Sequence, residues 1–366
     1  MIRVIKSTFN RVLGRGDAAI LMPVMDGPMK PNEKLDAAER IVEVPEIDNL
    51  TVGLDELWAT SGDQLGRVDA SGFRPVRQFT SEISSLAYWS ENRLAIGLNE
   101  GIVLIFDSGK DDVTEQIDVF CPTALLFWDK THLIIACGSK HFAPSAWQAD
   151  LMSKGSSGSI LIWETGGGVP KVLLSRLAYP AGLIGVNDNR LIFTEAWQHR
   201  LCALSNPNSQ KSKKNGVETI LSRLPGYPGA LTLNADGSVW LAIFAPRNQL
   251  VEFVLNDKEY RTRMMRDIEK PFWVAPTLRG GRSFHEPMQW GAVKQLGVLK
   301  PWAPVFSYGL AVRLNEEFQP IESLHSRADG NVHGVTSIVE QAENNGESIF
   351  AAAKGDGVLV KFNSIK

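Results

Sequence analysis

The stretch SSLAYWSENRLAIGLNEGIVLIFD, residues 84–107, decides the fold. An apolar run is followed by the polar turn SENR, a second apolar run, the turn NEG and a third apolar run. Runs rich in β-branched and aromatic residues, separated by short turns with Asn and Gly, are typical of antiparallel hairpins. Residues 84–107 therefore predict three neighbouring strands of one antiparallel sheet.

The same order of strand, polar turn and strand recurs along the chain. The other segments are LTVGLDELWATSG (50–62), TALLFWDKTHLIIACGS (123–139), GLIGVNDNRLIFTEAW (182–197), GALTLNADGSVWLAIFAP (229–246) and VTSIVEQAENNGESIFAAAKGDGVLVKF (335–362). A single unit of this kind cannot bury both of its faces, so neighbouring units must stack. Six such units predict an all-β protein, a six-bladed β-propeller.

The predicted domain is one propeller over residues 38–366. A strand near residues 40–45 is expected to complete the last blade, because this tie between the two ends removes free sheet edges. Residues 1–37 are expected to form an N-terminal extension with a short helical segment that packs on the propeller. The basic residues in that segment also allow contact with anionic lipid, an interpretation that we do not favour.

Two insertions interrupt the repeated pattern. Residues 140–158 contain a short predicted helix after Pro144, with Ser145 as its N-cap. Residues 256–307 are rich in Trp, Pro, Arg and Met and lack the alternation of strands. Long insertions in compact domains usually act as lids or binding loops. We expect both insertions on one face, around the mouth of a central pocket.

Composition narrows the class of protein. The formal net charge is −3, so no basic excess points to nucleic acid as a partner. The chain has no signal-peptide pattern and no apolar run long enough to cross a bilayer, which favours a cytoplasmic location. Cys121, Cys137 and Cys202 lack metal-site spacing and are expected to be buried reduced thiols. The oligomeric state is left open.

Four motifs carry a family resemblance. They are GPMKPNEKLDAAERI (27–41), FTEAWQHRL (193–201), LPGYPGAL (224–231) and YGLAVRLNEEFQPIESLHSRADGNVHGVTSIVEQ (308–341). Their sequence and order resemble the strictosidine-synthase-like proteins, and among these the adipocyte plasma-membrane-associated protein group. The wider relatives include gluconolactonases, paraoxonases and regucalcin-type lactonases. The resemblance implies the same six-bladed propeller.

The resemblance also implies a divalent cation, usually calcium, on the propeller axis, held by oxygens at the starts of the inner strands. The corresponding positions here are Asn49 beside Asp48 in the first unit, Ala181-Gly182 in the fourth and Gly229-Ala230 in the fifth. One Asn and one Asp cannot supply the roughly six oxygen ligands that calcium needs. We therefore expect a degenerate axial site and no cofactor, with Asp48 and Asn49 as the nearest metal-ligand candidates.

Strictosidine synthase itself uses a Glu of the last blade as its acid and base. The resemblance puts Thr336 at or beside that position. A threonine hydroxyl with an ordinary pKa cannot carry out that proton transfer. True synthase activity is therefore not expected, and Thr336 is a candidate for ligand contact.

Glu195, Trp197, His199 and Arg200 form a polar and aromatic cluster at the end of a predicted strand. In one interpretation Glu195 faces the pocket as a catalytic base, and Trp197 and Arg200 bind the ligand with Asn49. In the other, Glu195 and Arg200 form a structural salt bridge that closes a turn.

Histidines and tryptophans near the predicted pocket mouth are further candidates. His141 and His333 could transfer protons, since a neutral imidazole is suited to that task, and His285 could contact a ligand. Each could equally be a bystander. Trp147 lies in the first insertion, where it either lines an apolar ligand pocket or packs the lid.

Two functions follow from these observations. The first is a small-molecule hydrolase of lactonase or arylesterase type, acting on an apolar or ester-type molecule in the central pocket, and it depends on family analogy. The alternative is a non-catalytic propeller that binds a ligand or a partner. The neutral positions Ala181, Gly229, Ala230 and Thr336 favour the alternative. Whether the chain is an enzyme stays open.

Overall fold

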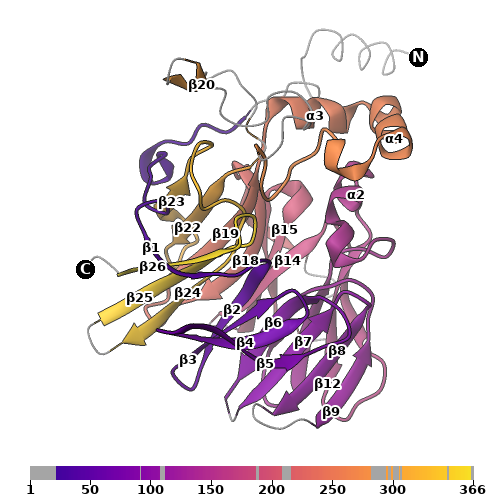
Figure 1. The fold of residues 1–366 in the computed structure, drawn as a ribbon. Helices are drawn as coiled ribbons and strands as arrows, with labels where there is room; N and C mark the ends of the chain where they lie inside the picture. Colours follow the sequence, from indigo (N-terminus) through magenta and orange to yellow (C-terminus); the bar gives the residue numbers. More distant parts are fainter. Residues whose placement is uncertain are drawn as a thin grey trace.

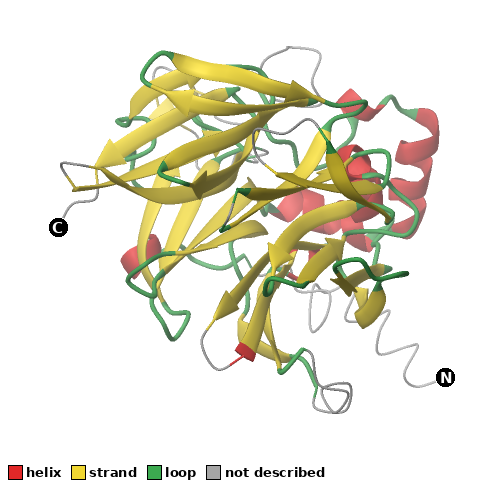
Figure 2. Ribbon diagram, turned by 90° about the horizontal axis from the view of Figure 1, so that it is seen from below, coloured by secondary structure: helices red, strands yellow, loops and turns green. Residues whose placement is uncertain are grey.

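The computed structural model describes residues 22–363, except 91, 108–111, 187–188, 208–215, 282–293, 296–297, 300–304, 306 and 344–345. Six four-stranded antiparallel sheets are arranged around a central axis as the blades of a β-propeller (Figure 1). Most of the helices gather in one region outside the strands (Figure 2). In the described part of the chain, no helix combines the length and the apolar character needed to cross a bilayer.

Each of the first four blades is built from four consecutive strands. Blade one has β2 (Ile47–Gly53), β3 (Glu56–Ser61), β4 (Gln64–Asp69) and β5 (Gly72–Gln78), and blade two has β6 (Ile83–Trp89), β7 (Arg93–Leu98), β8 (Ile102–Asp107) and β9 (Val113–Asp118). Blade three has β10 (Pro122–Phe127), β11 (His132–Cys137), β12 (Gly158–Glu164) and β13 (Lys171–Leu177). Blade four has β14 (Pro180–Val186), β15 (Arg190–Glu195), β16 (Arg200–Ser205) and β17 (Glu218–Leu221), with η5 (Ala196–Gln198) in its turn.

The last two blades depart from this consecutive order. Blade five has β18 (Gly226–Leu233), β19 (Val239–Pro246), β22 (Gly309–Leu314) and β23 (Pro320–Ser326). Blade six has β24 (Val335–Glu343), β25 (Gly346–Ala353) and β26 (Val358–Asn363), and its fourth strand is β1 (Glu39–Glu43). Strand β1 pairs antiparallel with β26, with Glu43 opposite Val358. Pairing of the first and last described strands therefore closes the ring. The short helix η2 (Gly27–Met29) precedes β1 in the chain.

Apolar side chains fill the spaces between neighbouring blades. The middle strands are the most deeply buried, as in β7, where five consecutive residues from Leu94 to Leu98 are buried. Trp58 and Trp240 are almost fully enclosed and lie under the arginines Arg67 and Arg313. Both faces of such strands are covered, because each blade packs against a blade on either side. Stacking is what supplies the core that a single blade lacks.

The first insertion contains η3 (Pro144–Ala146) and α2 (Trp147–Met152). Ser145 lies within η3, so the prediction that it caps the helix is wrong; Ala146 precedes α2 and makes no side-chain cap bond. The sequence places the helix correctly but misses its first turn, because a 3₁₀ turn precedes it.

The second insertion lies between β19 and β22 and begins earlier than the predicted residue 256. It contains α3 (Gln249–Asn256), α4 (Lys258–Asp267), η7 (Lys270–Phe272) and the short pair β20 (Lys294–Gln295) and β21 (Val298–Leu299). The Asn248 side chain caps α3 by accepting a hydrogen bond from the Val251 amide. We call α2, α3 and α4 together the lid.

Candidate functional site

A central pocket of about 300 Å³ lies at the end of the axis that the lid approaches. Its inner wall comes from the starts of the inner strands. Each inner strand shifts register against its neighbour near its start, and β18 does so twice. The residues at these shifts include Asn49, Ser84, Thr123, Ala181-Gly182, Gly229-Ala230 and Thr336. All of these except Gly182 line the pocket. A bulge re-aims a side chain, so the repeated bulge turns one position per blade toward the axis.

Three of these residues link one blade to the next. The Ser84 hydroxyl donates to the carbonyl of Pro122, the first residue of the next inner strand, at 2.6 Å. Thr123 donates in the same way to the Pro180 carbonyl, also at 2.6 Å. The Asn49 amide donates to Thr60 at 2.9 Å and lies 3.4 Å from the Ile83 carbonyl. These polar groups therefore already stabilise the junctions between blades one to four.

This series of hydrogen bonds between neighbouring inner strands stops at blade four. A Cβ added to Gly182 would lie 2.2 Å from the Gly229 carbonyl oxygen, so β14 and β18 approach too closely for side chains there. At the other end of the series, the Thr336 hydroxyl is buried and has no hydrogen-bond partner in the described residues. An unsatisfied buried hydroxyl is costly, which makes Thr336 a natural contact for a bound molecule or water.

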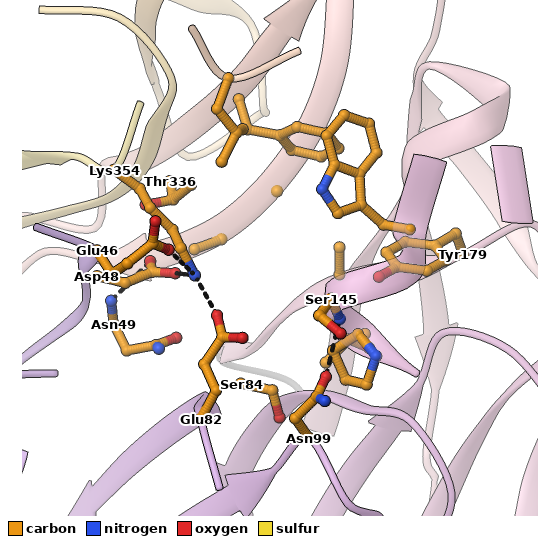
Figure 3. A pocket seen from close by; sticks show the side chains of 18 residues that line it. Glu46, Asp48, Asn49, Glu82, Ser84, Asn99, Ser145, Tyr179, Thr336 and Lys354 are labelled. Atoms are coloured by element: carbon orange, nitrogen blue, oxygen red, sulfur yellow. Dashed lines mark hydrogen bonds and ion pairs between the residues drawn. The ribbon is translucent and has the colours of Figure 1, made fainter. Parts of the chain in front are cut away.

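Lys354 lies on the polar side of the pocket, in the turn after β25. Its ammonium nitrogen is 2.8 Å from Glu82, 3.3 Å from Asp48 and 3.4 Å from Glu46 (Figure 3). The carboxylates precede or begin the inner strands of blades one and two, whereas Lys354 comes from blade six. The lysine thus holds three carboxylates of two other blades together across the axis.

Lys354 carries a permanent positive charge in this site. Burial lowers the pKa of its ammonium, but the charges of Asp48, Glu82 and Glu46 outweigh that effect and hold the pKa above its ordinary value. A lysine that stays protonated cannot act as a nucleophile or form a Schiff base. Its contribution is electrostatic.

The opposite side of the pocket is apolar and lies under the lid. Trp147 of α2 packs edge-on against Phe244 of β19, with ring centroids 5.4 Å apart. Tyr179 is buried, and its hydroxyl points into the cavity (Figure 3). Leu278 completes this wall. The pocket therefore presents charged groups on one side and aromatic rings on the other.

The oxygen atoms around the axis already contact other groups of the protein. Calcium takes about six to eight oxygen ligands, with carboxylates supplying the charge. The carboxylates here already surround the Lys354 ammonium, and the Ser84 and Thr123 hydroxyls donate to carbonyls. In addition, no cluster of three or more His, Cys, Asp or Glu with metal-site geometry occurs among the described residues. A cation would have to displace the lysine.

The structure places Glu195 away from the central pocket. Its carboxylate is buried, accepts the Ala178 amide at 2.8 Å and accepts Arg200 Nε, also at 2.8 Å. Arg200 pairs opposite Glu195 in the β15–β16 hairpin. This arrangement matches the salt-bridge interpretation and leaves no oxygen of Glu195 directed at the axis.

The other predicted residues are dispersed. Trp147, Asn49 and Thr336 do line the pocket, whereas Trp197 lies behind its wall, stacked on Tyr179 with centroids 4.4 Å apart. His141 is exposed and is not among the lining residues. His285 lies outside the described residues.

His333 is fully buried in a structural network. Its Nε2 is 2.7 Å from the Arg327 carbonyl oxygen, and its Nδ1 is 2.8 Å from Arg279 Nη1. A neutral ring satisfies both contacts by donating from Nε2 and accepting at Nδ1. Burial and the charge of Arg279 accordingly lower the pKa of His333. None of the described histidines lines the central pocket.

Sequence reasoning missed Lys354, Glu46 and Glu82. A Lys in the turn AKGDG and a Glu before a strand are usually solvent-exposed, so nothing local distinguishes them. Tyr179 has a weak signal, since it stands two residues before the expected axial position Ala181. For Glu46 and Glu82 the available clue was the repeat itself, because a Glu precedes the inner strand in the first two units.

The comparisons with known proteins agree with this architecture. Protein strictosidine synthase-like 13 of Arabidopsis thaliana is 28% identical over 115 residues, which make up 31% of this chain and 27% of the plant protein. The chain is similar to the strictosidine synthase-like proteins. The match spans about a quarter of that strictosidine synthase-like protein, so it bears on kinship and not on activity. No protein-family model matches the chain.

A solved structure is similar in fold over nearly the whole length of the chain. The calcium-binding protein regucalcin from Agrobacterium tumefaciens superimposes with a TM-score of 0.53, covering 90% of this chain and 93% of regucalcin at 12% identity. Identity this low shows the fold alone. A nidogen/laminin complex, with a TM-score of 0.41 over 54% of this chain and 72% of the matched one at 16% identity, is too distant to support a conclusion.

Proposed function

We propose that this strictosidine synthase-like propeller binds a small amphipathic molecule in its central pocket without a divalent cation. The observation that carries the proposal is the position of Lys354, whose ammonium supplies positive charge among Glu46, Asp48 and Glu82. The axial site is then degenerate as a metal site, because an internal cation takes the place of the ion.

The lining supports an amphipathic ligand. Binding sites for small molecules combine apolar walls with a few placed polar groups. Trp147 and Phe244 offer the apolar wall, while Thr336 offers an unsatisfied hydroxyl on the other side. A ligand with an aromatic or aliphatic body and one polar group would satisfy Thr336 and cover the rings.

Hydrolysis of an ester or lactone is the second candidate. The observation in its favour is that the Tyr179 hydroxyl points into the cavity that Thr336 also lines (Figure 3). Two hydroxyl donors could polarise a carbonyl oxygen. Burial raises the pKa of Tyr179 well above its ordinary value, so this group would act as a donor and not as a base.

One experiment separates the two functions. The purified protein is assayed on phenyl acetate and a panel of lactones, with added calcium and with EDTA, and the same compounds are titrated in a thermal-shift measurement. We expect ligand-dependent shifts in melting temperature that are the same in calcium and in EDTA, and no turnover. Turnover that disappears with EDTA would overturn the proposal of a cation-free pocket.

Variants locate the binding. Trp147→Leu should abolish the ligand-dependent thermal shift, because Trp147 forms part of the apolar wall. Trp89→Leu is the matched control, since Trp89 packs on Phe127 between other blades and does not line the pocket. Equal loss in both variants would show that the shift does not report on the central pocket.

A further inference from the structure

A second cavity, of about 640 Å³, opens between the lid and blade four. We call it the blade-four cleft. Its apolar floor is formed by Leu151 of α2, Leu255 of α3 and the indole of Trp197. Trp197 separates it from the central pocket, since the ring stacks on Tyr179, which lines that pocket. The cleft is thus a separate site with a shared wall.

The charged residues of the cleft are mostly cationic. Lys154, Arg200, Arg223 and Arg247 line it, and Glu252 is the one carboxylate among the lining residues. Each cation comes from a different segment: Lys154 follows α2, Arg247 precedes α3, Arg200 begins β16 and Arg223 follows β17. The lid and blade four therefore face each other with positive charge.

Part of this charge is compensated and part is not. Arg247 Nε lies 2.7 Å from Glu252, and Arg200 Nε lies 2.8 Å from the buried Glu195 beneath the cleft. Among the described residues, Lys154 Nζ has a neutral hydrogen-bond partner, the amide oxygen Oδ1 of Asn256, at 3.3 Å, and no carboxylate partner. Arg223 is exposed, and no ion pair joins it to a residue that the structure describes. Four cations and two carboxylates leave an excess of two positive charges.

We propose that the blade-four cleft binds a small organic molecule that carries a phosphate group. A phosphate monoester is close to a dianion at neutral pH, which matches the excess charge. Guanidinium forks suit phosphate oxygens, and the hydroxyls of Thr219 and Ser222 lie in the same cleft as further donors. The floor of Trp197, Leu151 and Leu255 accommodates the organic part. The bound phosphate bridges the lid to blade four.

Isothermal titration calorimetry on the full chain tests this proposal with three probes: phenyl phosphate, inorganic phosphate and benzoate. We expect phenyl phosphate to bind most tightly, inorganic phosphate to bind more weakly, and benzoate, a monoanion, to bind about tenfold more weakly than phenyl phosphate. If inorganic phosphate binds as tightly as phenyl phosphate, free phosphate is the occupant. That result would overturn the proposal that the ligand carries an organic group.

Arg223→Gln should weaken phenyl phosphate binding about tenfold, since it removes one of the two cleft cations that have no carboxylate partner among the described residues. Its exposed position makes a folding defect improbable, and circular dichroism checks this. Arg263→Gln, which removes an exposed arginine of α4 that pairs with Glu259 outside the cleft, should leave the affinity unchanged. Absence of phenyl phosphate binding, equal losses in both variants, or benzoate binding as tight as phenyl phosphate would each overturn the proposal.

Discussion

At the scale of single residues, Lys354 connects three blades. Breaking a largely buried ion pair on one side leaves the other charges uncompensated. Lys354→Met keeps the length of the side chain and removes the charge. We expect the free energy of unfolding to fall by about 2–3 kcal/mol, below the range for fully buried pairs because Glu46 and Glu82 are partly exposed. Urea unfolding at pH 7 measures the loss.

Two controls test the electrostatic cause. Lys354→Arg keeps the charge and should recover most of the lost stability. The deficit of Lys354→Met should shrink at high ionic strength, because salt screens the repulsion among the three carboxylates that lose their cation. A deficit that is independent of salt concentration would show that Lys354 acts by packing alone.

His325 makes stability depend on pH. The ring is fully buried between Ser323 and Tyr308, and burial, with the charge of Lys34, lowers its pKa to about 4. The unfolded chain takes up a proton near pH 6.5, before the folded chain does. Stability is therefore complete above about pH 6.5 and is lost as the pH falls toward 4.

At pH 5, the lowered pKa of His325 reduces the free energy of unfolding by about 2 kcal/mol relative to its value at neutral pH. The variant His325→Gln cannot take up that proton, so its free energy of unfolding should fall less between pH 7 and pH 5 than that of the unmodified chain. His199 and His333 also have lowered pKa values, so a shallower slope remains. Denaturant unfolding at both pH values measures the slopes, and equal slopes would contradict the role of His325.

At the scale of elements, hydrogen bonds to Asp150 hold α2 against the propeller. Its buried carboxylate accepts the Ser139 hydroxyl and the Trp197 indole N–H, both at 2.7 Å. Asp150→Ala would leave both donors unsatisfied inside the protein. We expect a loss of about 3 kcal/mol and faster hydrogen exchange in residues 139–155. The lid would loosen above Trp147, so ligand-dependent thermal shifts should also decrease.

The matched control for this prediction is Asp267→Ala, at the exposed end of α4. That carboxylate pairs with the neighbouring Arg266 in solvent, where such a pair adds little stability. Exchange in residues 139–155 should stay at the rate of the unmodified chain. Similar acceleration in both variants would mean that any loss of an acidic residue loosens the lid.

At the scale of the whole molecule, stability depends on closure of the ring by β1. Val42 is buried between this strand and blade one, in a cluster with Ile47, Leu57 and Phe350. Val42→Asp would place a charge there and detach β1. We expect a loss of about 3 kcal/mol together with aggregation, because β26 then becomes a free sheet edge.

Thermal unfolding and static light scattering check this prediction. Glu39→Ser is the control, since Glu39 is exposed on the same strand and its loss leaves the pairing with β26 intact. If Val42→Asp keeps the scattering mass and the melting temperature of the unmodified chain, closure by β1 does not limit stability.

Much of the architecture was predictable because it repeats. Each blade presents the same order of strands and turns, so six local patterns sufficed for the number of blades. The neutral axial positions Ala181, Ala230 and Thr336 were also predictable, since they occupy one place in each repeat. The start of α3 was not, because the apolar residues of QLVEFVLN fit a strand as well as a helix.

The sequence by itself determined the blades and the neutral residues Ala181, Gly229 and Ala230 at the axial positions. Only the tertiary structure decided what occupies the axis instead. Lys354 meets Asp48 and Glu82 because closure of the ring brings the last blade beside the first two. Local patterns specify strands through nearest neighbours, whereas a charge contact across the axis depends on the geometry of the completed ring.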